Sequence, residues 1–106
     1  MIFMLEATYP GTRVDEAAKR FLERLKNKPM PDSVKMRDLY AFAGGEGFRV
    51  LLFYDVDDAR TKEGLDWIAD GMVDSLRNIE EYKMAGLVVY PMEEAFAFLG
   101  MQVPEV

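Results

Sequence analysis

The apolar pattern of this chain of 106 residues predicts an α+β fold in the order strand, helix, strand, strand, helix, strand. Three observations support it: two amphipathic helical stripes, a glycine-rich turn between two apolar strands, and a length that suits one core. This order gives a four-stranded antiparallel sheet with two helices on one face. We expect a single domain over residues 1–106, with its core in 1–91 and a short C-terminal helix and tail in 92–106.

The first strand and helix follow from periodicity. Residues 2–9 alternate between two faces, one carrying Leu5 and the other Met4 and Glu6. After a Pro-Gly break, Thr12 is expected to be the N-cap of the helix. The apolar stripe of that helix has the spacing of one helical face: Val14, Ala17, Ala18, Phe21, Leu22 and Leu25.

The next two strands form a predicted hairpin. Residues 34–43 and 48–55 flank the turn Gly44-Gly45-Glu46-Gly47. Folding about this turn sets Ala43 opposite Phe48 and, further along, Arg37 opposite Tyr54. The turn is not expected to hold a phosphate group, because a strand follows it instead of a helix N-terminus. Both faces of this hairpin are largely apolar.

The second half of the core repeats the pattern. Asp57 or Asp58 is expected to cap the second helix, and residues 82–90 are expected to form the last strand, followed by a short helix. The acidic run 55–58 lacks the glycine and the distal glutamate of an EF-hand, so we attribute it to capping and expect no metal site. The second helix has this apolar stripe: Leu65, Ile68, Ala69, Met72, Val73 and Leu76.

A sheet with both helices on one face leaves its other face bare, and here that face is too apolar to stand against water. The element order is the ferredoxin-like βαββαβ unit. Over residues 1–91 the chain resembles the dimeric α/β-barrel superfamily, in which two ferredoxin-like subunits pack sheet against sheet. The resemblance implies a homodimer through the open sheet face. The residues expected on that face are Ile2, Met4, Glu6, Thr8, Met36, Asp38, Tyr40, Phe42, Arg49, Leu51 and Phe53.

The resemblance also bears on chemistry. That superfamily includes haem-degrading monooxygenases of antibiotic-biosynthesis type, muconolactone-isomerase-like proteins and effector domains of Lrp-like regulators. Several of the enzymes rely on a histidine as base or haem ligand. This chain has no histidine and no cysteine, so no catalytic residue is carried over and no cofactor is expected. The usual nucleophilic triads, which need a histidine base, are excluded as well.

Charge and hydropathy limit the partners. The net charge of −6 opposes nucleic-acid binding. The basic residues on or just after the first helix, Arg24 among them, are interleaved with acidic ones, which is typical of a solvated helix face. No apolar run approaches a membrane span, and the opening Met1–Leu5 lacks the basic region of a signal peptide. We therefore expect a cytoplasmic protein that binds neither nucleic acid nor membrane.

The open face supplies the candidate site. Strand alternation can bring Glu6 and Arg49 together there as a desolvated pair in which each charge needs the other. A structural ion pair and plain packing are the alternatives to a ligand site. The residues expected to line a small ligand pocket are Glu6, Asp38, Tyr40, Arg49, Tyr54 and Trp67.

Two functions remain open. The first is a homodimeric small-ligand-binding or accessory protein without chemistry of its own, and the missing histidine favours it. The alternative is a cofactor-free enzyme of monooxygenase or isomerase type, which would work through these four open-face residues: Glu6, Asp38, Tyr40 and Arg49.

Overall fold

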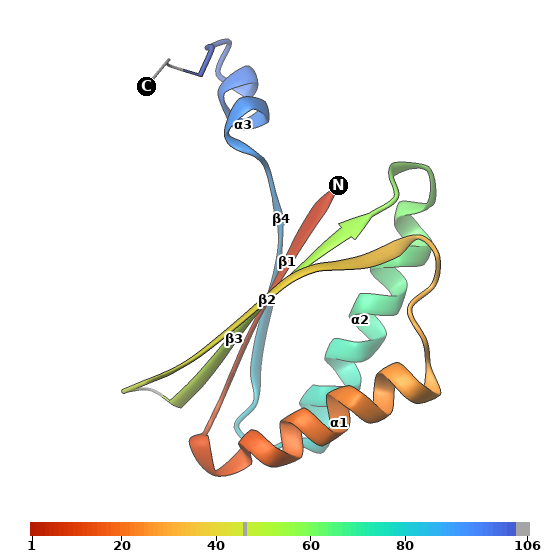
Figure 1. The fold of residues 1–106 in the computed structure, drawn as a ribbon, viewed down its shortest axis with the longest axis vertical. Coiled ribbons are helices and arrows are strands. Elements are labelled where there is room, and N and C mark those ends of the chain that lie inside the picture. The colour runs from red at the N-terminus through yellow and green to blue at the C-terminus, as the bar shows by residue number, and fades with distance from the viewer. Residues whose placement is uncertain (46, 104–106) are drawn as a thin grey trace.

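The computed structural model describes residues 1–45 and 47–103. Its strands form one antiparallel sheet in the order β2-β3-β1-β4, and helices α1 and α2 lie on one face of it (Figure 1). This confirms the predicted ferredoxin-like βαββαβ fold. The elements are β1 (Ile2–Tyr9), α1 (Val14–Asn27), β2 (Val34–Gly44), β3 (Gly47–Val56), α2 (Thr61–Asn78), β4 (Lys83–Val89) and α3 (Met92–Phe98).

The hydrophobic core lies between the sheet and the two long helices. In the central strand β1, Leu5 pairs with Leu52 of β3 and with Gly86 of β4. Gly64 lets α2 approach β3 closely, because a Cβ atom there would stand 2.6 Å from Cγ1 of Val56. The buried apolar residues are Leu5, Ala7, Tyr9, Ala17, Val34, Leu52, Tyr54, Val56, Ile68 and Ile79.

The hairpin register is confirmed near the turn and is wrong further along. From Ala43 opposite Phe48 onward the pairs are those expected, but the register shifts between Met36 and Asp38. Tyr54 therefore faces Met36 instead of Arg37. A β-bulge adds one residue to a strand and so reverses the alternation beyond it. Met36, expected on the open face, packs against the core on the helix side.

Two predictions about helix starts have different outcomes. Thr12 is not an N-cap, because Gly11–Arg13 form a 3-10 turn and α1 begins at Val14 without a side-chain cap. Asp57 caps the 3-10 turn Asp58–Arg60 that leads into α2, since its Oδ1 accepts a hydrogen bond from the N–H of Ala59 at 2.9 Å. The helix α2 itself begins at Thr61 without a side-chain cap, so the expected capping of the second helix is displaced to this turn. The hydrogen bond from the backbone of Ala59 is the main reason that the pKa of the Asp57 carboxyl is lowered.

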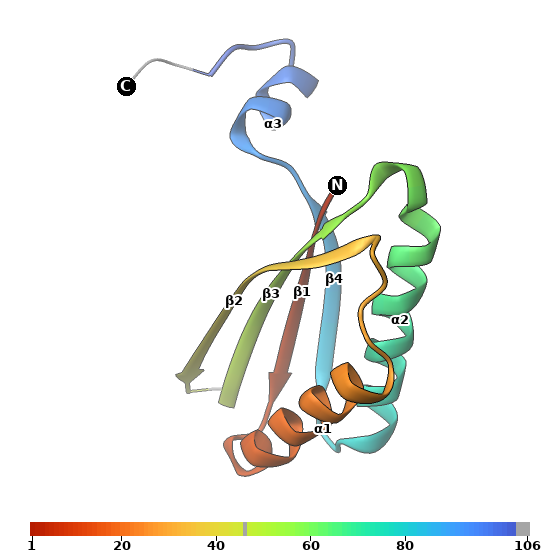
Figure 2. The same cartoon turned by 45° about the vertical axis from the view of Figure 1, so that its right-hand side comes forward.

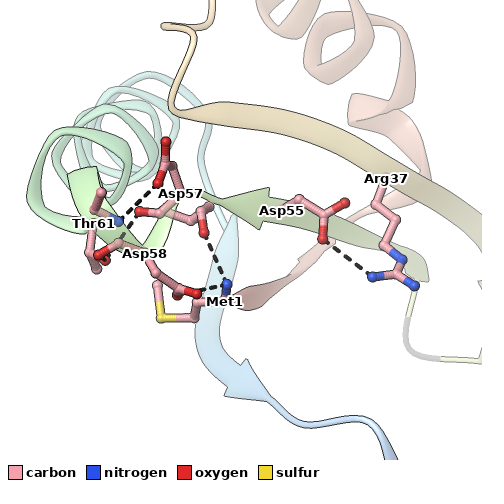
Figure 3. A network of polar contacts seen from close by, with 8 residues as sticks. Met1, Arg37, Asp55, Asp57, Asp58 and Thr61 are labelled. Carbon is pink, nitrogen blue, oxygen red and sulfur yellow. Dashed lines mark hydrogen bonds and ion pairs between the residues drawn. The ribbon is translucent and has the colours of Figure 1, made fainter.

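The aspartates at the end of β3 and the start of α2 form ion pairs or hydrogen bonds with other groups of the protein (Figure 3). Asp58 lies 3.0 Å from the amino group of Met1, and Asp55 lies 3.3 Å from Nη1 of Arg37, which stands at the bulge. Within residues 1–45 and 47–103, no group of three or more His, Cys, Asp or Glu residues is placed to hold a metal ion. No helix in the same part of the chain is both long and apolar enough to cross a membrane.

The C-terminal helix stands apart from the rest. Figures 1 and 2 show α3 beyond the end of the sheet and away from α1 and α2. We call residues 90–103 the C-terminal arm. Much of its apolar surface is exposed, including Met92, Phe98 and Leu99.

Candidate functional site

The open face is the side of the sheet opposite α1 and α2 (Figure 2). Residues directly opposite one another in antiparallel strands point to the same face, so the register defines rows of side chains across it. Thr8 lies between Arg49 and Lys83. The adjacent rows are Glu6 with Leu51 and Ala85, and Met4 with Phe53 and Leu87. The row around Thr8, which we call the hairpin end, is cationic, and the middle of the face is mostly apolar.

The predicted ion pair is present on this face. Nε of Arg49 lies 3.1 Å from Oε1 of Glu6, and the two side chains are 39% and 35% exposed. Glu6 is opposite Leu51, and Arg49 is opposite Thr8, so the contact is diagonal between neighbouring rows. The guanidinium carbon of Arg49 also lies 5.7 Å from the ring centre of Phe42. The pair thus bridges the cationic and the apolar parts of the face.

Two more predicted residues share the open face. Asp38 is opposite Phe53 and Tyr40 is opposite Leu51. The Tyr40 ring meets the Phe53 ring edge to face, with centroids 6.1 Å apart, yet 57% of Tyr40 remains exposed. The structure therefore brings four of the six predicted residues, Glu6, Asp38, Tyr40 and Arg49, to one surface.

Tyr54 and Trp67 lie on the other side of the sheet. Tyr54 is buried beneath α2, and its ring packs edge to face on Trp67 at 6.2 Å. The expectation that all six residues line one pocket is therefore wrong, because alternate residues of β3 point to opposite faces. Burial raises the pKa of the Tyr54 hydroxyl to about 12, despite the nearby positive charge of Arg24.

A small cavity accompanies these two aromatic residues. It encloses about 60 Å³ between α1, α2 and the sheet, and Tyr54, Trp67 and Tyr82 contribute to its lining. Arg24 also lines it and holds the helices together: Nη2 donates to the carbonyl of Trp67 at 2.8 Å, and Nη1 lies 3.2 Å from Oδ2 of Asp70. A space of this size suits ordered water, whereas drug-sized ligands occupy roughly 300–1,000 Å³.

Two larger hollows lie at the hairpin end, and Arg49 contributes to the lining of both. Both include Thr8 in their lining. One measures about 560 Å³ and is lined by Thr8, Tyr9, Pro10, Arg49, Glu81 and Lys83. The other measures about 200 Å³ and is lined by Thr8, Phe42, Gly44, Gly45, Gly47 and Arg49. These half-open hollows place the hydrogen-bond donors of Thr8, Arg49 and Lys83 beside the aromatic rings of Tyr9 and Phe42.

Sequence reasoning missed two features. It left Lys83 out of the site, because the register of β4 against β1 cannot be derived from either strand alone. It also treated Arg24 as part of a solvated helix face, although only 11% of this side chain is exposed. One signal was available: Gly71 on α2 leaves room for Arg24, and a Cβ atom there would stand 2.7 Å from its Nε.

Comparisons with known proteins add little to this geometry. No protein family matches the chain, and no curated protein matches it. Among solved structures, the chain is similar to a candidate antibiotic biosynthesis monooxygenase from Caulobacter crescentus. The two are 18% identical, the match covers 85% of this chain and 90% of that one, and the TM-score is 0.47. Likeness at this level says nothing about activity, so the fold assignment rests on the element order and the register.

Proposed function

We propose that this protein is a homodimeric small-ligand-binding protein whose open face packs against the open face of a second copy. The observation that carries the proposal is the apolar character of that face. Tyr40, Phe42 and Leu87 are between 45% and 57% exposed there, in a single continuous surface across four strands. Contiguous apolar surface of this kind is typical of interaction sites.

The ligand site of this dimer lies at the hairpin end. Arg49, Lys83 and Thr8 supply hydrogen-bond donors, and Phe42 supplies an aromatic wall. Glu6 pairs with Arg49, and Glu81 lines the larger hollow together with Lys83. This combination suits a small, mainly apolar molecule that carries a hydrogen-bond-accepting oxygen.

Molar mass tests the dimer. Light scattering at micromolar concentration is expected to give the mass of two chains, and Phe53→Asp is expected to reduce it to that of one chain, because an unpaired charge is costly to bury. Leu22→Asp is the matched control, since Leu22 lies on α1 and is 65% exposed. A wild-type monomer contradicts the proposal, and so does a control that dissociates while the Phe53 variant stays dimeric.

Native mass spectrometry tests the ligand. The purified dimer is expected to carry a co-purifying small molecule, and Thr8→Val or Lys83→Met is expected to reduce its occupancy. Lys62→Met, on the exposed surface of α2, is the control. A dimer that carries no small molecule, even after exposure to a cell extract, contradicts the binding function and leaves a purely structural homodimer.

The cofactor-free enzyme is the second candidate. It is favoured by one observation, the presence of Glu6, Asp38, Tyr40 and Arg49 on a single face. If the bound molecule is transformed, its mass should change during incubation, and Tyr40→Phe or Glu6→Gln should slow that change. A bound molecule that stays unaltered supports binding without chemistry.

A further inference from the structure

The C-terminal arm has the apolar composition of a buried segment, yet its large apolar side chains are exposed. Met92, Phe98, Leu99 and Met101 are between 56% and 72% exposed. The arm folds on itself through Tyr90, whose ring meets Phe98 edge to face at 4.9 Å. Its helix has only 7 residues, and isolated helices shorter than about 12–15 residues are marginal in water. The arm therefore needs a surface to pack on.

The position of the arm indicates which surface that is. β4 ends with Val89 opposite Ile2, whereas the hairpin end of the sheet has Tyr9 opposite Phe48. The arm thus leaves the sheet at the end opposite the hairpin (Figures 1 and 2). A two-fold axis that lies between two facing sheets and runs perpendicular to the strands reverses the strand direction in the second copy. With that symmetry, each arm projects toward the hairpin end of the other copy.

Charge agrees with this arrangement. The arm carries Glu93 and Glu94 and no basic residue. At the hairpin end Arg49 already pairs with Glu6, so Lys83 is the cation that the carboxylates of the arm are expected to meet, with Phe42 as apolar surface nearby. Opposite charges around an apolar centre are the usual complementarity of an interface. A dimer with the strands parallel would instead set the two acidic arms at the same end.

We propose that the C-terminal arm of each copy docks on the hairpin end of the partner subunit and closes the ligand site there. The inference rests on the proposed dimer and deepens it. Each site then combines Thr8, Arg49 and Lys83 of one chain with Phe98 and Leu99 of the partner subunit. The ligand site is incomplete in a single copy, because the hollow of about 560 Å³ beside Arg49 is open to solvent on its outer side.

Cross-linking tests the position of the arm in the full chain, which contains no cysteine of its own. Glu94→Cys and Lys83→Cys are made in separate chains, one of them carrying a tag, then mixed and treated with a short bismaleimide. A link between the tagged and untagged chains is expected. Glu94→Cys mixed with Lys19→Cys is the matched control, because Lys19 is exposed on α1, and it is expected to give no more than background linkage.

Exchanging the charges of Lys83 and of the two arm glutamates tests whether these groups attract one another across the dimer. At low salt, Lys83→Glu is expected to weaken dimerisation about tenfold, and adding Glu93→Lys and Glu94→Lys to the same chain is expected to restore it. Lys19→Glu controls for net charge and is expected to change little. A wild-type dimer that shows neither the cross-link nor the restoration overturns the arm inference and leaves the proposed dimer standing. A wild-type monomer overturns both.

Discussion

The two faces of the sheet differ in composition and in what covers them in a single copy. On the helix side, Leu52 and Tyr54 are no more than 5% exposed. On the open side, Tyr40 and Leu87 are more than half exposed, and the Glu6–Arg49 pair lies among the apolar residues. A face that mixes large apolar side chains with a few charges has the composition of an interface, whereas the helix side is a true core. Apolar alternation alone does not distinguish these two cases.

The largest effect expected from this comparison concerns two adjacent leucines of β3. Leu52 points to the helices and is buried, and Leu51 points to the open face and is partly exposed. Leu52→Ala should lower the free energy of unfolding by about 2–5 kcal/mol at every protein concentration, because it leaves a cavity. Urea unfolding monitored by circular dichroism measures this.

Leu51→Ala is the matched variant on the other face. It should change the unfolding of the separate chains by less than about 1 kcal/mol, and it should weaken dimerisation about tenfold, as loss of a half-buried leucine at an interface does. Sedimentation at several concentrations measures the second effect. Equal losses of monomer stability for the two variants would show that the faces do not differ as described.

The loss of stability at alkaline pH should also differ between the two faces, by less than the effect of Leu52→Ala. The pKa of Tyr54 is raised by burial from 10.0 to about 12, so the folded chain keeps this hydroxyl neutral where the unfolded chain ionises it. The stabilising contribution is complete below pH 10 and is lost as the pH rises to about 12. Tyr54 should account for a loss on the order of 2 kcal/mol over that interval.

Tyr54→Phe provides the measurement. Denaturant unfolding between pH 9 and about 12 should show a shallower decline for Tyr54→Phe than for the wild type. Tyr40→Phe, on the exposed open face, should decline in parallel with the wild type. Tyr82 contributes to the decline in all three proteins, because burial also raises its pKa to about 12. Parallel curves for wild type and Tyr54→Phe would contradict the buried position of this hydroxyl.

Sequence reasoning captured the parts of the fold that local patterns determine. The glycine-rich turn set the hairpin register as far as Asp38, because a short turn and two-residue alternation leave few pairings. The bulge beside Arg37 was missed, since an extra residue in one strand depends on its partner and on packing above the sheet. The false N-cap at Thr12 has a similar cause: the 3-10 turn Gly11–Arg13 delays the helix.

The candidate site was captured in part for the same reason. Alternation brought Glu6 and Arg49 to one face, and the structure pairs them. Alternation also places Tyr54 on the helix side of the sheet. The predicted site, which included both Tyr54 and Glu6, therefore combined residues from the two opposite faces. The contribution of Lys83 depends on pairing between β1 and β4, which are separated by most of the chain. Such long-range registers are determined by tertiary packing, and a single sequence does not display them.

The smallest effect expected concerns the Glu6–Arg49 pair and depends on what covers the open face. In a single copy both side chains are more than one third exposed, and exposed ion pairs typically contribute about 0–1 kcal/mol. The double-mutant cycle of Glu6→Gln and Arg49→Met should therefore give a coupling free energy in that range at protein concentrations low enough to dissociate the dimer. Urea unfolding of the four proteins measures it.

The same double-mutant cycle at high protein concentration tests whether a second copy covers the open face. If a second copy desolvates the pair, removing one partner leaves a buried charge and costs about 3–5 kcal/mol, so the coupling should increase with protein concentration. If Glu6 instead serves a ligand, Glu6→Gln should be neutral or stabilising at every concentration, because functional groups are often held at a cost in stability. A coupling that stays below about 1 kcal/mol at all concentrations would mean that the pair remains solvated and that the dimer forms elsewhere.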